Sequence, residues 1–182
     1  TDTDGFGASL GLYKMAKALG KEAYIVQDTV DATVTKIMEN IHSEYVELKN
    51  DIISPKKAIS LSNDKSLLMI VDFQTVYQSP DNGAELGAPN ERIVKKFKNI
   101  AIIDHHRKGA GAIENYKFYY SKTYASSSVE IILELLEFWK KPVDFSPVEA
   151  TWLLLGIIVD TNNFIYRANA KTFEVSSILK KY

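Results

Sequence analysis

The chain contains no cysteine among its 182 residues. This absence excludes disulfide bonds, thiolate metal sites and cysteine nucleophiles, and it fits a reducing compartment. Any metal ligands in this protein must therefore be nitrogen or oxygen atoms.

An excess of charge of one sign is also missing, because 22 Lys and Arg residues stand against 23 Asp and Glu residues. A net charge of −1 provides no basic field that would hold duplex nucleic acid by releasing counterions. If the substrate is a nucleotide, we expect a small one and no duplex nucleic acid as a partner.

Long hydrophobic runs are absent as well. The longest uncharged apolar run covers residues 152–159, far short of the roughly 20 residues that a membrane-spanning helix needs. The sequence begins at Thr1 without a methionine or a signal-peptide pattern. We expect residues 1–182 to form one domain that belongs to a larger protein.

Helical and strand patterns alternate along the chain. Helical spacing of apolar residues predicts helices at 7–19, 29–42, 127–140, 147–158 and 172–181, and short apolar runs predict strands at 23–26, 45–48, 67–71, 100–103 and 117–120. Residues 51–62 are ambiguous, and 79–89 have the composition of a surface loop. The runs at 67–71 and 100–103 are continuously apolar, which is typical of strands covered on both faces. These patterns predict an α/β fold with a doubly wound, mainly parallel sheet and helices on both faces.

Acidic side chains occur where this fold would place its ligand site. Asp2 and Asp4 precede the first predicted helix, Asp72 and Asp104 each end a predicted strand, and Asp160 follows a helix. Strand-end loops of one sheet converge, and carboxylates that meet raise one another's pKa unless cations neutralise them. With oxygen donors in the majority, Mn²⁺ or Mg²⁺ is favoured over Co²⁺, Zn²⁺ or Fe²⁺. Two such ions about 3.5–4 Å apart would activate a water and stabilise the leaving oxygen of a phosphoester.

Each of these signals also has a structural explanation when it is taken alone. An Asp after a strand is usually a turn or capping residue, and an Asp-Thr-Asp-Gly terminus is usually a flexible turn. Adjacent histidines in a loop are commonly solvated. A run of three serines predicts a helix N-cap, and the alternative is that its hydroxyls are available to a ligand; these are Ser126, Ser127 and Ser128. The joint arrangement of the acidic and histidine residues is what favours a site.

The chain resembles the DHH phosphoesterase family, which is named for the Asp-His-His found here at Asp104, His105 and His106. The resemblance is strongest to the GdpP/YybT branch of cyclic-di-AMP phosphodiesterases. The stretches that support it are residues 2–9, 70–72, 103–107, 124–130 and 156–164, the last of them followed by Thr172-Phe173-Glu174.

The resemblance implies two metal sites and a set of substrate contacts. One site would use Asp2, Asp72 and a histidine upstream of this sequence, and the other would use Asp4, Asp72, His105 and Asp160, with Asp72 as the bridge. His106 and Arg107 would bind the substrate phosphate, and His106 would protonate the leaving oxygen. Asp104 would orient an imidazole. Ser127 is counted as a further substrate contact.

The function that the resemblance implies is hydrolysis of cyclic di-AMP to linear pApA with two Mn²⁺ ions, Mg²⁺ or Co²⁺ being alternatives. An oligoribonuclease and pAp phosphatase of the nanoRNase type, or a catalytically weak nucleotide-binding module, remains open. A pyrophosphatase of the same superfamily is disfavoured by residues 156–164.

The same resemblance implies features of the whole protein. Relative to the family, this sequence lacks the first strand, and a C-terminal DHHA1 domain would close over the substrate in the intact protein. The parent protein would be anchored in a bacterial membrane with this domain on the cytoplasmic side, and a homodimer is a further expectation.

Overall fold

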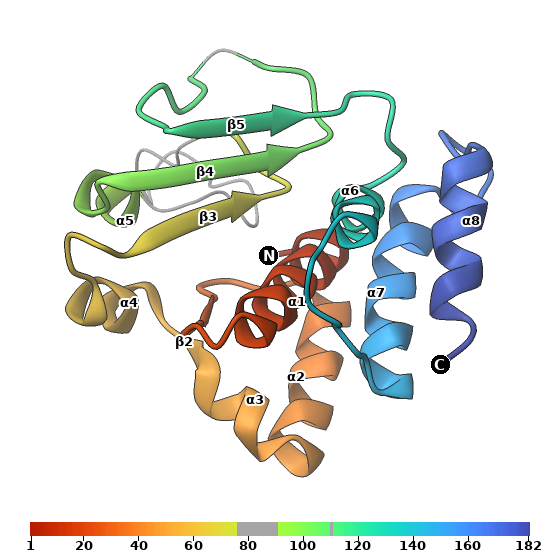
Figure 1. The fold of residues 1–182 in the computed structure, drawn as a ribbon, viewed down its shortest axis with the longest axis horizontal. Helices are drawn as coiled ribbons and strands as arrows, with labels where there is room; N and C mark the ends of the chain where they lie inside the picture. Colours follow the sequence, from red (N-terminus) through yellow and green to blue (C-terminus); the bar gives the residue numbers. More distant parts are fainter. Residues whose placement is uncertain (76–90, 110) are drawn as a thin grey trace.

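The computed structural model describes residues 1–75, 91–109 and 111–182. Within these residues helices and strands alternate along the chain (Figure 1). The elements are α1 (Thr3–Ala18), β1 (Ile25–Val26), α2 (Ala32–Glu44), α3 (Val46–Asp51), β2 (Ile52–Ile53), α4 (Pro55–Leu61), β3 (Leu67–Val71), α5 (Glu91–Lys96), β4 (Asn99–Asp104), β5 (Phe118–Ser121), α6 (Ser128–Glu137), α7 (Pro147–Asp160) and α8 (Ala170–Leu179).

The named strands pair in parallel, as predicted, but they are divided between two sheets. Strands β3, β4 and β5 form one sheet in that order, and β1 pairs with β2 in the other. In the larger sheet Val71 pairs with Ile103 and Asp104 pairs with Ser121. The carboxyl ends of its strands therefore lie together, on the side where Figure 1 shows α1 and α6.

Helices lie on both faces of the larger sheet, on one of them only near the carboxyl ends of the strands, and this confirms the predicted α/β architecture. On one face Leu68, Ile70, Ile100 and Ile102 pack with apolar residues of α4 and α5. On the other face Ile103 joins the main core, which is formed largely by α1, α6 and α7. The apolar residues of β4 are buried from Ile100 through Ile103, as the continuous run predicted.

Strand β3 departs from its prediction, because Leu67 and Met69 are exposed while Leu68 and Ile70 are buried. The exposed residues lie on the face that the main core covers only near the carboxyl end, where Val71 and Ile103 reach it. An apolar run in sequence therefore did not mean burial along the whole strand.

Helix α1 begins earlier than predicted, at Thr3, because the side chain of Asp2 caps it by accepting a hydrogen bond from the Gly5 N–H. Its glycines permit close packing. A Cβ at Gly11 would lie 2.6 Å from Ile132 Cγ2 of α6, so the two helices approach closely at this position. The first turn of α1 is thereby brought to the sheet edge where the acidic residues gather.

Two other predictions have different outcomes. The strand predicted at residues 45–48 is wrong, because residues from Val46 begin helix α3; a short stretch of β-forming residues did not decide the local structure. The capping box before α7 is confirmed, with Ser146 and Glu149 bonded reciprocally and Pro147 in the first helical turn. The surface loop predicted at residues 79–89 lies outside the described residues.

Among the described residues, no helix combines the length and the apolar character needed to cross a membrane.

Candidate metal centre

Four side chains from four different elements meet at the carboxyl edge of the larger sheet. Asp4 comes from the first turn of α1, Asp72 follows β3, His105 follows β4, and Asp160 ends α7. One ligand atom from each of the four lies within 4.8 Å of all the others. The structure thus brings together the residues predicted to form the complete metal site.

Asp72 occupies a turn that directs its carboxylate into this cluster. Its φ of 65° lies in the left-handed region, which Asp tolerates better than most residues. Its backbone N–H donates to Ile103 O at 3.0 Å, and the Ser128 hydroxyl donates to its Oδ1 at 3.1 Å. Both the backbone and the side chain of Asp72 are therefore held in place.

Asp4 is held by the N-terminus of α6. Ser128 N donates to Asp4 Oδ2 at 2.6 Å, and Val129 N donates to Asp4 Oδ1 at 3.0 Å. The unpaired N–H groups and the positive end of the helix dipole favour a carboxylate at this position. The side chain is fully buried.

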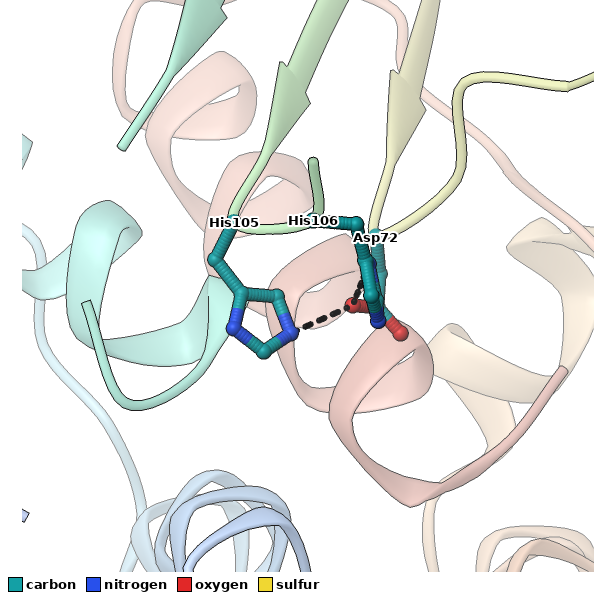
Figure 2. Close-up of side chains that lie close together, drawn as sticks. All are labelled: Asp72, His105 and His106. Carbon is teal, nitrogen blue, oxygen red and sulfur yellow. Dashed lines mark ion pairs between the residues drawn. The ribbon is translucent and has the colours of Figure 1, made fainter. Parts of the chain in front are cut away.

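His105 presents one ring nitrogen to the carboxylates. Its Nδ1 donates to Ala125 O at 3.4 Å, and its Nε2 lies 3.1 Å from Asp160 Oδ2 and 3.3 Å from Asp72 Oδ1. None of these oxygens meets Nε2 in hydrogen-bond geometry, and this buried nitrogen has no hydrogen-bond partner among the described residues. Figure 2 shows the ring of His105 directed at the Asp72 carboxylate.

The buried carboxylates of the cluster favour a positive charge close to them. Burial and the charge of Asp160 raise the pKa of Asp4 to about 6, and burial and the charge of Asp4 raise the pKa of Asp72 well above its ordinary value. Burial opposes protonation of His105, but the adjacent carboxylates of Asp160 and Asp72 outweigh it and raise its pKa to about 11. A proton on His105 therefore fills the place of a cation.

A divalent cation fits this arrangement of donors. With Nδ1–H bonded to a backbone carbonyl, Nε2 is the free nitrogen of the neutral ring, which is how metal-binding histidines are usually oriented. Carboxylate oxygens with one imidazole nitrogen suit Mn²⁺ or Mg²⁺. Asp4, Asp72, His105 and Asp160 would hold the ion, and its binding would displace the proton from His105.

The second histidine of the motif lies on the open side of the cluster. His106 is half exposed, and its Nδ1 lies 2.8 Å from Oδ1 of the fully buried Asp104. Burial would raise the pKa of Asp104, but the hydrogen bonds from His106 hold it below its ordinary value. Asp104 thus contacts one imidazole in the way expected of an orienting carboxylate.

A cavity of about 200 Å³ opens beside His106, and Arg107 and Phe73 contribute to its lining. Phe73 stacks on the His106 ring with the centroids 6.5 Å apart. Asp72, His105 and His106 form a second group whose potential ligand atoms lie within 4.8 Å of one another (Figure 2). His106 therefore lies close to the main cluster and also lines the cavity.

Two predicted site residues lie apart from the main cluster. Asp2 caps α1 and belongs to neither ligand group. Its carboxylate and that of Asp72 both border Gly5, because a Cβ there would lie 3.2 Å from Asp2 Oδ1 and 3.4 Å from Asp72 Oδ2. Ser127 is fully buried, and its hydroxyl accepts the Glu130 N–H as the N-cap of α6. Ser127 therefore has the capping role in this structure, and its contact with a substrate stays a prediction.

The sequence did not indicate the residues that support the predicted metal ligands. Ser128 contacts both Asp4 and Asp72, and Gln74 Nε2 donates to His106 O at 3.2 Å. The run of serines at a helix start was a visible signal, which predicted a cap first and hydroxyls available to a ligand as the alternative, but it did not indicate contacts with Asp4 and Asp72. Gln74, next but one after Asp72, had no distinguishing signal in the sequence.

Comparison with known proteins shows the class to which this fold and site belong. The model of the DHH family, N-terminal domain, matches residues 1–157. A solved structure of an exopolyphosphatase-related protein from Bacteroides fragilis shares the fold, with a TM-score of 0.71 and 19% identity over 100% of this chain and 49% of that one. The chain therefore belongs to the DHH family.

Curated relatives specify the likeness further. The cyclic-di-AMP phosphodiesterase GdpP of Bacillus subtilis is 39% identical over 181 residues, which are 98% of this chain and 26% of that protein. A bifunctional oligoribonuclease and PAP phosphatase, NrnA of Thermus thermophilus, is 30% identical over 90% of this chain and 41% of that protein. The chain thus spans about a quarter of the length of the GdpP relative.

Proposed function

We propose that this chain is the metal-binding part of a phosphodiesterase that opens cyclic di-AMP to the linear dinucleotide pApA. The observation that supports this most is the convergence of Asp4, Asp72, His105 and Asp160, whose ligand atoms lie within 4.8 Å of one another. The 39% identity to GdpP of Bacillus subtilis favours cyclic di-AMP over other phosphoesters.

The residues around the cluster have distinct proposed roles. Divalent cations, with Mn²⁺ as the preferred candidate, are held by the carboxylates of Asp4, Asp72 and Asp160 and the His105 imidazole. When bound, such ions neutralise the phosphate and lower the pKa of an attacking water. His106 faces the cavity and gives a proton to the leaving oxygen, while the buried Asp104 fixes the orientation of its ring. Arg107, in the same cavity lining, binds the phosphate oxygens.

A second metal position is proposed on the side of Asp2. The closeness of both Asp2 and Asp72 to Gly5 supports this placement, with Asp72 shared between the two ions. By resemblance we also propose that the intact protein supplies a further histidine ligand, a DHHA1 domain over the substrate, a membrane anchor that leaves this domain on the cytoplasmic side, and a homodimer partner.

The test is a chromatographic assay on the natural full-length protein with cyclic di-AMP and Mn²⁺. We expect pApA to form, and we expect His105→Ala to abolish its formation because the cluster loses its only nitrogen ligand. His42→Ala is the matched control, since the third histidine of the chain lies exposed on α2, and it should leave the rate unchanged.

A specific alternative is hydrolysis of short linear oligonucleotides or pAp, which the 30% identity to NrnA of Thermus thermophilus favours. The same assay separates the two functions. If cyclic di-AMP survives while a linear dinucleotide or pAp is consumed, the alternative is correct. Binding of cyclic di-AMP without turnover of any of these substrates would indicate a nucleotide-binding module instead.

A further inference from the structure

Glu130 is a buried carboxylate that the proposed chemistry does not use. It lies in the first turn of α6, and its side chain has no exposed surface. No ion pair to a Lys, Arg or His is seen for it within the described part of the chain, and its Oε1 has no hydrogen-bond partner there. Burying a carboxylate without a cation is unfavourable, and the hydrogen bonds to its other oxygen, Oε2, offset part of that cost.

One oxygen of Glu130 gathers three donors. Oε2 accepts from Ser126 N at 3.2 Å, from Ser126 Oγ at 2.5 Å and from Thr172 Oγ1 at 2.7 Å. A glutamate at this helix position usually bonds to the N–H of the capping residue. Here it reaches the residue before the cap, and it therefore fixes the backbone that enters α6.

The segment that Glu130 fixes touches three of the proposed metal ligands. We call residues 125–129 the ligand-holding turn. Ala125 O accepts from His105 Nδ1, the N–H groups of Ser128 and Val129 donate to Asp4, and the Ser128 hydroxyl donates to Asp72. Ser126 lies within this turn, and its N–H and hydroxyl both donate to Glu130 Oε2.

We propose that Glu130 is the positioning residue of the metal centre, acting through the ligand-holding turn on Asp4, Asp72 and His105. This inference rests on the proposed function, because it assumes that these side chains bind a metal. Supporting groups of this kind, although they do not touch the metal, usually change metal affinity 10- to 100-fold when they are removed.

The test compares Mn²⁺ affinity, by calorimetric titration, of the wild type with that of Glu130→Ala and Glu130→Gln. Glu130→Ala should bind Mn²⁺ at least about 10-fold more weakly. Glu130→Gln should stay within about 3-fold of the wild type, because its amide oxygen can accept the same three bonds while its NH₂ takes the place of the unpartnered Oε1. Rescue by glutamine separates a positioning role from a requirement for charge.

Glu149→Ala is the matched control. Glu149 holds the equivalent position in α7, is also buried, and bonds to Ser146 N and Lys14 away from the ligands. Its replacement should lower stability and leave Mn²⁺ affinity unchanged. Unchanged affinity in Glu130→Ala, or an equal loss in Glu149→Ala, would overturn the proposal.

A second measurement keeps the inference separate from the proposed function. The NMR signals of the His105 imidazole in the metal-free protein should shift in Glu130→Ala and stay in place in Glu149→Ala, because only the first moves the Ala125 carbonyl. If the wild type binds Mn²⁺ but leaves cyclic di-AMP intact, the proposed function fails and the positioning role stands. If the imidazole signals of Glu130→Ala match those of the wild type, the positioning role is wrong whatever the activity.

Discussion

Replacing Gly156 by alanine tests whether helix packing sets the geometry of the metal centre. Gly156 lies inside α7, and a Cβ there would sit 3.0 Å from Val129 Cγ2, 3.1 Å from Asp4 Cα and 3.2 Å from Asp4 Oδ1. Contacts this short require the neighbours to give way by a few tenths of an ångström. The added methyl group therefore pushes directly on Asp4, one of the proposed metal ligands.

Two opposing effects set the expected loss of stability. Overpacking a core costs about 1–3 kcal/mol, and replacing Gly by Ala inside a helix contributes about 1 kcal/mol in the stabilising direction. The net change in the free energy of unfolding should be a loss of about 0–2 kcal/mol. Metal affinity should also fall, by about 10-fold, because the Asp4 carboxylate is displaced from its partners.

The assay combines urea unfolding with calorimetric titration of Mn²⁺. Gly11→Ala is the control, because its Cβ would lie 2.6 Å from Ile132 Cγ2 and 3.9 Å from Leu153 Cδ2, and no metal ligand is among its near neighbours. It should destabilise the protein with unchanged Mn²⁺ affinity. If Gly156→Ala binds Mn²⁺ as tightly as the wild type, or Gly11→Ala weakens binding equally, the reasoning is refuted.

Two further predictions concern the charge and the core of the same region. The pKa of Asp4 is raised from 3.8 to about 6 in the folded protein, so its ionisation destabilises the metal-free fold as the pH rises through that window. The stability of Asp4→Asn relative to the wild type should therefore increase between pH 4 and pH 6 in thermal unfolding with chelator, and a constant or falling difference would contradict this. Leu153 is fully buried where α7 meets α1. The substitution Leu153→Ala should lower the free energy of unfolding by about 2–5 kcal/mol. A decrease of less than about 1 kcal/mol in urea unfolding would show that the core is not packed as described.

Elements whose signals are local could be predicted from the sequence. The capping box at Ser146 and Pro147 needed only neighbours along the chain, and the structure confirms it. Strand β4 was predicted from an uninterrupted apolar run, and the structure shows its apolar residues buried on both faces. Where the outcome depended on what packs on top, as for the exposed Leu67 and Met69 of β3, the same pattern misled.

The residues that support the site could not be predicted in this way. Ser128 donates to Asp4 across 124 positions of sequence and to Asp72 across 56. Glu130 reads from sequence as an ordinary acidic residue in a first helical turn, and only its burial against Thr172 distinguishes it. The predicted strand at residues 45–48 failed for a related reason, because its few β-forming residues became the start of α3.

The sequence by itself determined the chemistry that this protein can offer. Without cysteine, its ligands had to be oxygen and nitrogen atoms, and the Asp-His-His motif after an apolar strand placed them at a sheet edge. Only the tertiary structure decided that Asp4, Asp72, His105 and Asp160 meet while Asp2 caps a helix and Ser127 is buried. The physical reason is that caps and strands depend on neighbouring residues, whereas the meeting of these ligands depends on how α1, α6 and α7 pack against the end of the sheet.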